Sequence, residues 1–111
     1  MYRITKTFTW EAAHRIPTLA PEHPCRRIHG HSFRAEVTLE GQTLNRHGFI
    51  RDVADLAPLR KTIDSHFVGT LCELSVELMA ELLFNRAKEL CPETILVRVY
   101  EGSDVWGEYQ E

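Results

Sequence analysis

Cys25, His29 and His31 place a thiol and two imidazoles close together in the chain. Side chains alternate along a β-strand, so the two histidines would lie on one face of a strand that begins there. That face continues with apolar residues, namely Phe33, Ala35, Val37 and Leu39. A single buried histidine is usually a core residue hydrogen-bonded to the backbone. Two buried histidines on the same face of one strand both need polar partners, and one metal ion would satisfy both.

A third imidazole comes from the first alternating segment of the chain, residues 2–14. His14 falls on the same face of this segment as Phe8 and Trp10. We therefore expect His14, His29 and His31 to form one metal site. Three neutral imidazoles without a fourth protein ligand are typical of a Zn²⁺ ion that stays open to water or substrate.

Cys25 admits two interpretations. As a fourth ligand it would close the zinc site and make it structural. As a nucleophile or base it would act from a thiolate favoured by the nearby metal and by Arg26 and Arg27. Its place in a proline-rich loop, rather than on the ligand strand, favours the second interpretation. The zinc would then act as a Lewis acid on a carbonyl or hydroxyl oxygen and acidify the neighbouring C–H. Phosphate groups could be held by arginines in or near the loops: Arg15, Arg26, Arg27 and Arg51.

The composition is that of an ordinary globular domain, with 43% hydrophobic and 26% charged residues among 111. We expect one domain over residues 1–111. The net charge of −3 argues against a nucleic acid or a membrane surface as partner. No apolar run approaches the roughly 20 residues of a membrane span. The N-terminus lacks the apolar core of a signal peptide, and three cysteines is an odd number, so we expect free thiols and a cytoplasmic protein.

The elements that must position these residues follow from periodicity and capping. Strands are expected over residues 2–14, from His29 to about residue 40, and over residues 95–101 and 105–109, with a short extra piece at residues 49–50. A short helix would begin at Asp52 or Asp55 and end near residues 64–66, and a longer one would run from Ser75 to Pro92. This order predicts an α+β domain: a four-stranded antiparallel sheet with two helices on one face. The wide apolar face of the second helix has two interpretations. The helix packs only on its own sheet, or it packs on the sheet and also contributes to a subunit interface.

Glu101 closes the third strand on its apolar face. It is either an exposed carboxylate at the strand end or the anchor of a ligand.

Four motifs resemble the 6-pyruvoyl- and 6-carboxytetrahydropterin synthases: Glu11-Ala12-Ala13-His14-Arg15, Cys25-x3-His29-Gly30-His31-Ser32, Arg51-Asp52-Val53-x-Asp55-Leu56 and Val97-x-Val99-x-Glu101. The resemblance covers about residues 2–109. The three residues between the cysteine and the first histidine of the second motif resemble the bacterial carboxy branch.

This resemblance implies the tunnelling fold, or T-fold, in which three subunits join their sheets into a barrel and two trimers form a homohexamer. It implies zinc at His14, His29 and His31, catalysis by Cys25, and a pterin ring held by Glu101. The implied substrate is 7,8-dihydroneopterin triphosphate. The implied products are 6-carboxy-5,6,7,8-tetrahydropterin, acetaldehyde and triphosphate, on the route to queuosine and other 7-deazapurines.

The resemblance also implies a catalytic aspartate–histidine pair, which maps to Asp64 and His66 with Ser65 between them. In the family the two residues are adjacent. If Ser65 occupies the place of the histidine, the chain would bind zinc and a pterin without catalysing the standard reaction. The third interpretation is a structural metal protein, which chelation would unfold.

Overall fold

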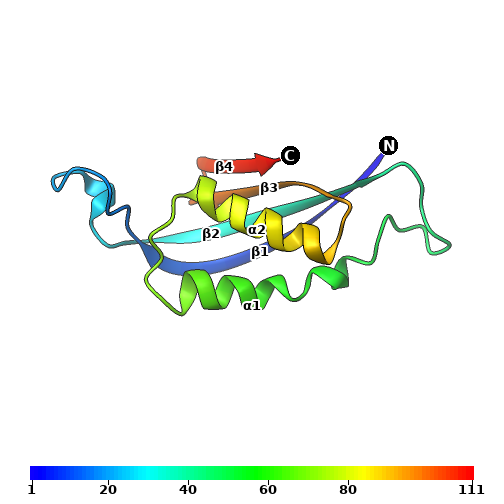
Figure 1. Cartoon of the computed structure of the whole chain (residues 1–111), viewed down its shortest axis with the longest axis horizontal. Helices are drawn as coiled ribbons and strands as arrows, with labels where there is room; N and C mark the ends of the chain where they lie inside the picture. Colours follow the sequence, from blue (N-terminus) through cyan, green and yellow to red (C-terminus); the bar gives the residue numbers. More distant parts are fainter.

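The computed structural model describes residues 1–111 and shows one sheet with its helices on a single face (Figure 1). The strands are β1 (Tyr2–His14), β2 (His29–Gly41), β3 (Thr94–Glu101) and β4 (Val105–Gln110). They lie in the order β1-β2-β3-β4, and all neighbours are antiparallel. The helices α1 (Leu59–Ile63) and α2 (Val76–Leu90) come between β2 and β3 in the chain. The predicted α+β architecture is confirmed.

Apolar–polar alternation decides which face of the sheet is buried. Ala35, Val37 and Leu39 have no exposed surface, and they form one core with residues of β1, β3 and both helices. Their neighbours of opposite parity line the uncovered face, as period-two alternation requires. β1 pairs with β2 over its whole length, from Tyr2 opposite Gly41 to His14 opposite His29.

The first helical segment begins as the 3₁₀ turn η2 (Val53–Leu56) and continues through α1. Asp52 caps it, because its carboxylate accepts the N–H of Ala54 at 2.9 Å. Three apolar residues of this segment are fully buried in the core: Leu56, Leu59 and Ile63.

The first helix does not end near residues 64–66 as predicted. It continues as a π-helical turn, η3 (Asp64–Val68), in which the Gly69 N–H donates to the Asp64 carbonyl at 2.6 Å. Phe67 on this turn is fully buried and stacks on Trp10 with ring centroids 5.5 Å apart. Burial of this aromatic ring holds the additional turn on the sheet.

The α2 helix begins where the sequence places it. The Ser75 hydroxyl accepts the N–H of Leu78 at 3.2 Å, and the helix ends before Pro92. Its first turn packs closely on β4, because a Cβ at Gly107 would lie only 3.0 Å from the Glu77 nitrogen. Glycine therefore lets the N-terminus of α2 approach this edge of the sheet.

The expected short strand at Phe49 and Ile50 is wrong. The Asn45 side chain accepts the N–H groups of His47 and Phe49 and folds the segment into a turn, so these groups are not available to a sheet. No helix of the chain is both long and apolar enough to cross a membrane.

Candidate metal centre and adjoining cavity

Three imidazoles meet where β1 ends and β2 begins. The strand register puts His14 opposite His29 and Ala12 opposite His31, so all three rings reach the covered face of the sheet. One ligand atom from each ring can be chosen so that all three lie within 4.8 Å of one another. The structure thus brings together the three histidines that the sequence pointed to.

Backbone carbonyls fix the protonation of two of these rings. His14 Nδ1–H donates to the Leu74 carbonyl at 3.1 Å, and His29 Nδ1–H donates to the Arg27 carbonyl at 2.7 Å. Because a carbonyl can only accept, Nδ1 carries a proton in both rings, and the lone pair of the neutral ring then lies on Nε2.

His14 Nε2 is buried and has no hydrogen-bond partner. Burial lowers the pKa of His14, which keeps the ring neutral. A buried lone pair without a partner is costly, and a metal ion would satisfy it. The donor set therefore fits Zn²⁺, which binds neutral imidazoles.

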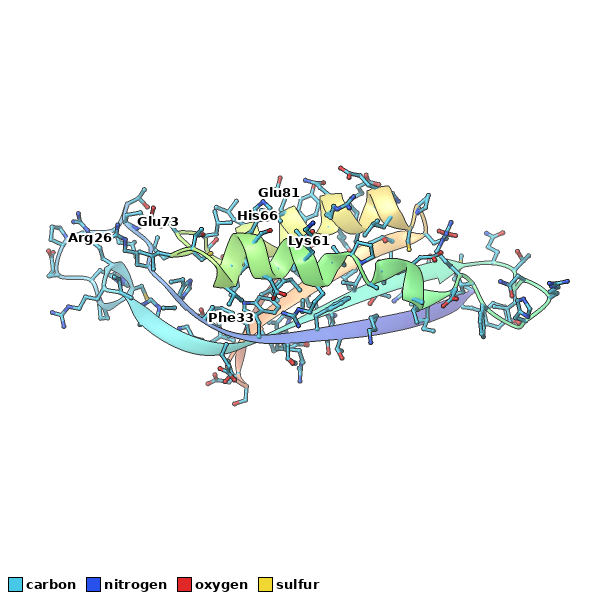
Figure 2. All side chains as sticks on the ribbon, turned by 90° about the horizontal axis from the view of Figure 1, so that it is seen from below. Arg26, Phe33, Lys61, His66, Glu73 and Glu81 are labelled. Atoms are coloured by element: carbon cyan, nitrogen blue, oxygen red, sulfur yellow. The ribbon has the colours of Figure 1, made fainter.

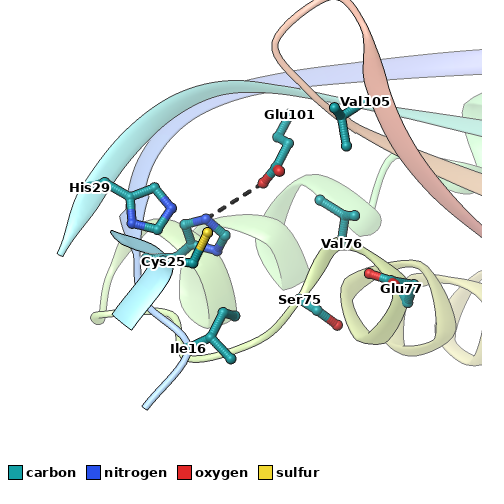
Figure 3. Close-up of a pocket in the computed structure, with 9 residues that line it drawn as sticks. Ile16, Cys25, His29, Ser75, Val76, Glu77, Glu101 and Val105 are labelled. Atoms are coloured by element: carbon teal, nitrogen blue, oxygen red, sulfur yellow. Dashed lines mark ion pairs between the residues drawn. The ribbon is translucent and has the colours of Figure 1, made fainter. Parts of the chain in front are cut away.

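Glu101 faces the imidazoles. Its Oε2 lies 3.6 Å from His14 Nε2 and 3.7 Å from His31 Nε2. Of the two alternatives drawn from the sequence, the geometry favours a ligand anchor, because the side chain is only 26% exposed and points inward (Figure 3).

A cavity of about 150 Å³ is lined by two of the three rings, those of His14 and His29. Cys25 and His29 lie on one side of it, Ser75 and Glu77 lie across from them, and Glu101 completes the wall (Figure 3). Three apolar side chains also line it: Ile16, Val76 and Val105. Cys25 is a free, exposed thiol, so it stands open to a small molecule in this cavity. Its role as base or ligand stays a prediction.

Several lining residues were not anticipated. The sequence indicates Ser75 only as the start of a helix, and Glu77 lies in the first turn of that helix. Their approach to the site depends on the close packing of Glu77 against Gly107, and a glycine in a sequence does not indicate which residue packs against it. The cavity thus holds a second carboxylate besides Glu101.

Two of the four arginines proposed for phosphate binding are engaged elsewhere. Arg15 pairs with Glu73 at 2.9 Å. Arg51 donates to Glu93 at 2.8 Å and to Asp55 at 2.9 Å, and these hydrogen bonds raise its pKa. Arg51 therefore ties the loop after β2 to the start of β3.

Arg26 and Arg27 form no ion pair with a carboxylate and directly follow Cys25 in the loop before β2. Neither residue lines the cavity itself. Among the four arginines, these two keep their charge available for an anion beside Cys25.

Asp64 and His66 lie outside the cavity of their own chain. Asp64 is exposed and pairs with Arg60 at 3.2 Å. His66 is exposed on the helix layer, far along the molecule from Arg26 (Figure 2). Its Nδ1–H donates to the Thr62 carbonyl at 3.0 Å, which leaves Nε2 free. The structure of one chain does not bring this pair to Cys25.

Residues 3–111 match the sequence model of the family described as 6-pyruvoyl tetrahydropterin synthase. The chain is 44% identical over 62 residues to a putative 6-carboxy-5,6,7,8-tetrahydropterin synthase of Pyrococcus abyssi, which covers 56% of this chain and 38% of that protein. It is 39% identical over 75 residues to the 6-carboxy-5,6,7,8-tetrahydropterin synthase of Synechocystis, covering 60% of this chain and 57% of that protein. The matched segments thus span less than two thirds of these relatives.

Solved structures show the same fold. The 6-pyruvoyl tetrahydropterin synthase of Caenorhabditis elegans superposes with a TM-score of 0.80 at 18% identity, covering 99% of this chain and 95% of that one. A catalytic-residue mutant of the Plasmodium vivax 6-pyruvoyltetrahydropterin synthase gives 0.69 at 13% identity, covering 100% and 99%. The sheet, its strand order and the helices on one face are those of the T-fold.

Proposed function

Because the chain belongs to the 6-pyruvoyl tetrahydropterin synthase family, we propose that it is a zinc-dependent lyase that converts 7,8-dihydroneopterin triphosphate to 6-carboxy-5,6,7,8-tetrahydropterin, with release of acetaldehyde and triphosphate. The observation that carries this proposal is a group of three imidazoles beside a cavity that two of them, His14 and His29, line together with a free thiol and a carboxylate. The named relatives of the carboxy branch support the choice of product. We place the reaction on the route to queuosine and other 7-deazapurines.

The residues divide the task by their chemistry. His14, His29 and His31 would hold Zn²⁺, which supplies a Lewis acid for a substrate oxygen and makes the adjacent C–H more acidic. Cys25, open to the cavity, would take that proton as a thiolate. Glu101 would accept hydrogen bonds from the amino and N–H groups of the pterin ring. Arg26 and Arg27 would hold the triphosphate.

The relay through Asp64 and His66 requires a second copy of the chain. Both residues are exposed and lie away from the cavity of their own subunit. His66 Nε2 is free to act on another molecule, since Nδ1 is bound to the Thr62 carbonyl. We propose a homohexamer, a dimer of trimers, in which one subunit offers this pair to the site of another. The unpaired edges of β1 and β4 support the assembly, because edge strands readily accept further strands.

We also propose that the protein forms a single T-fold domain and works in the cytoplasm. All three cysteines are free, which is typical of a reducing compartment.

A turnover assay tests the proposal. Purified protein loaded with zinc is given 7,8-dihydroneopterin triphosphate, and acetaldehyde and triphosphate are measured. Release of both supports the lyase, and Cys25→Ala should slow it by about 10²–10⁴. Binding of the pterin without release of either product would reject the lyase and support a second candidate, a zinc- and pterin-binding homologue. That candidate is favoured by Ser65, which separates Asp64 from His66.

A further inference from the structure

We infer that the Glu101 carboxylate is the fourth ligand of the resting metal site and that it leaves the metal when a pterin enters the cavity. The ligation rests on distances in this chain, and the exchange rests on the proposed function. The sequence had indicated three imidazoles without a fourth protein ligand, so the structure changes the expected state of the free enzyme.

The first argument is geometric. In a tetrahedral zinc site with metal–donor distances of about 2.05 Å, the donor atoms lie about 3.3 Å from one another. Glu101 Oε2 lies 3.6 Å from His14 Nε2 and 3.7 Å from His31 Nε2. Both separations exceed this value by only a few tenths of an ångström. Neither contact needs a protonated imidazole once a cation stands between the groups.

The second argument concerns the charge of the site. An imidazole binds a metal in its neutral form, so the three histidines would bring no charge to offset the cation. Glu101 is the carboxylate that lies against His14 and His31, so it is the group that can offset a divalent cation directly. Carboxylate oxygen is a common zinc ligand beside histidine.

The third argument concerns mobility. The backbone at Glu101 is fixed, because it ends β3 and the next residue, Gly102, donates its N–H to the Ser32 carbonyl at 3.0 Å. The side chain is held only at its carboxylate end and borders the cavity. It can therefore turn from the metal to a guest without movement of the strand.

These features make two roles of one carboxylate mutually exclusive. The oxygens that would accept hydrogen bonds from a pterin are those that would bind the metal. A pterin that engages Glu101 would draw it away and open a coordination position for a substrate oxygen. The Lewis acid would then become available only in an occupied cavity.

The experiment compares Glu101→Gln and Glu101→Ala with Glu77→Gln, which changes the same charge in the same cavity. Zinc affinity is measured by competition with a chromophoric chelator, and the visible spectrum is recorded after substitution with Co²⁺, whose bands report ligand number and type. Loss of even an outer partner of a metal ligand costs 10–100-fold in affinity, so the Glu101 variants should bind zinc at least about tenfold more weakly. Their Co²⁺ spectra should change, while both readouts of Glu77→Gln should match the unchanged protein. Circular dichroism verifies that each variant is folded.

Unchanged affinity in the Glu101 variants would overturn the ligation. So would a fall in affinity with an unchanged Co²⁺ spectrum, because it would show that the charge acts only through space. Neopterin is then added to the Co²⁺ protein, and binding followed by pterin fluorescence should shift the spectrum toward that of Glu101→Gln. Binding without a shift would overturn the exchange. If neopterin does not bind, both the exchange of Glu101 from metal to pterin and the proposed pterin specificity are overturned. The ligation of the metal by Glu101 is judged separately, from zinc affinity and the Co²⁺ spectrum, and does not depend on turnover in the lyase assay.

Discussion

Mixing two inactive variants should restore activity if His66 serves the site of another subunit. In one chain, His66 lies outside the cavity that Cys25 borders. Cys25→Ala should remove the proton acceptor and His66→Ala the relay. Each change alone should cost about 10²–10⁴ in rate.

The size of the recovery follows from counting subunits. In a randomly mixed 1:1 assembly, about half of the sites contain an intact Cys25, and about half of those face a neighbour with an intact His66. The expected rate is thus about one quarter of the unchanged protein. If both residues acted within one chain, no site in the mixture would contain both.

Co-expression with two different affinity tags yields mixed oligomers, and triphosphate release from 7,8-dihydroneopterin triphosphate measures their rate. The matched control mixes Cys25→Ala with the double variant Cys25→Ala, His66→Ala, which forms the same assemblies without a complete site. Mixed oligomers that remain at the rate of the single variants would refute the reasoning that His66 acts between subunits.

Four further predictions concern metal removal, pH, thiols and charge. Chelation should leave the far-ultraviolet circular dichroism intact, because the 20-residue core contains no metal ligand; loss of the helical signal would contradict this. Burial lowers the pKa of His14, so the unfolded chain takes up a proton at this ring near pH 6.5 while the folded chain resists it. The free energy of unfolding of the metal-free protein, measured with denaturant, should therefore fall as the pH drops below about 6.5. A free energy of unfolding that does not change with pH would count against a buried neutral ring. In the native protein, Cys25 alone should react readily with a thiol reagent, because burial raises the pKa of Cys72 and Cys91, and mass spectrometry of the labelled peptides tests this. Arg51→Met should cost about 1–2 kcal/mol of stability through lost charge-assisted hydrogen bonds yet leave KM unchanged, whereas a raised KM would return Arg51 to the site.

Local chemistry made most of the fold predictable. The alternation in residues 2–14 located β1 to the residue, since one face had to be buried. Ser75 and Pro92 bounded α2 because capping and the missing N–H of proline act locally. The same periodicity put all three histidines on the covered face, so the candidate metal group could be predicted before any coordinate.

The remainder depended on contacts that no local pattern encodes. The π turn at Asp64–Val68 was missed because it is held by Phe67 against Trp10, a residue distant in sequence. The engagement of Arg51 with Glu93 joins segments on either side of both helices. Two free arginines and two paired ones look alike in a sequence, and only packing distinguishes them.

Hydrogen bonds within the protein position most of the metal site before any metal binds. His14 is fixed by the Leu74 carbonyl, and the next N–H, that of Arg15, donates to Cys72 at 3.1 Å, so the end of β1 is anchored to the segment that leads into α2. The Ile16 N–H donates to the Cys25 carbonyl at 2.8 Å, which sets the loop carrying the thiol against the same strand end. His31 is the exception, because its ring makes no hydrogen bond to backbone or to another side chain and is 30% exposed. The three donor atoms lie up to 4.8 Å apart and must come closer together to bind a cation. Because the His31 ring is free to turn, we expect it to make most of this movement without displacing a strand.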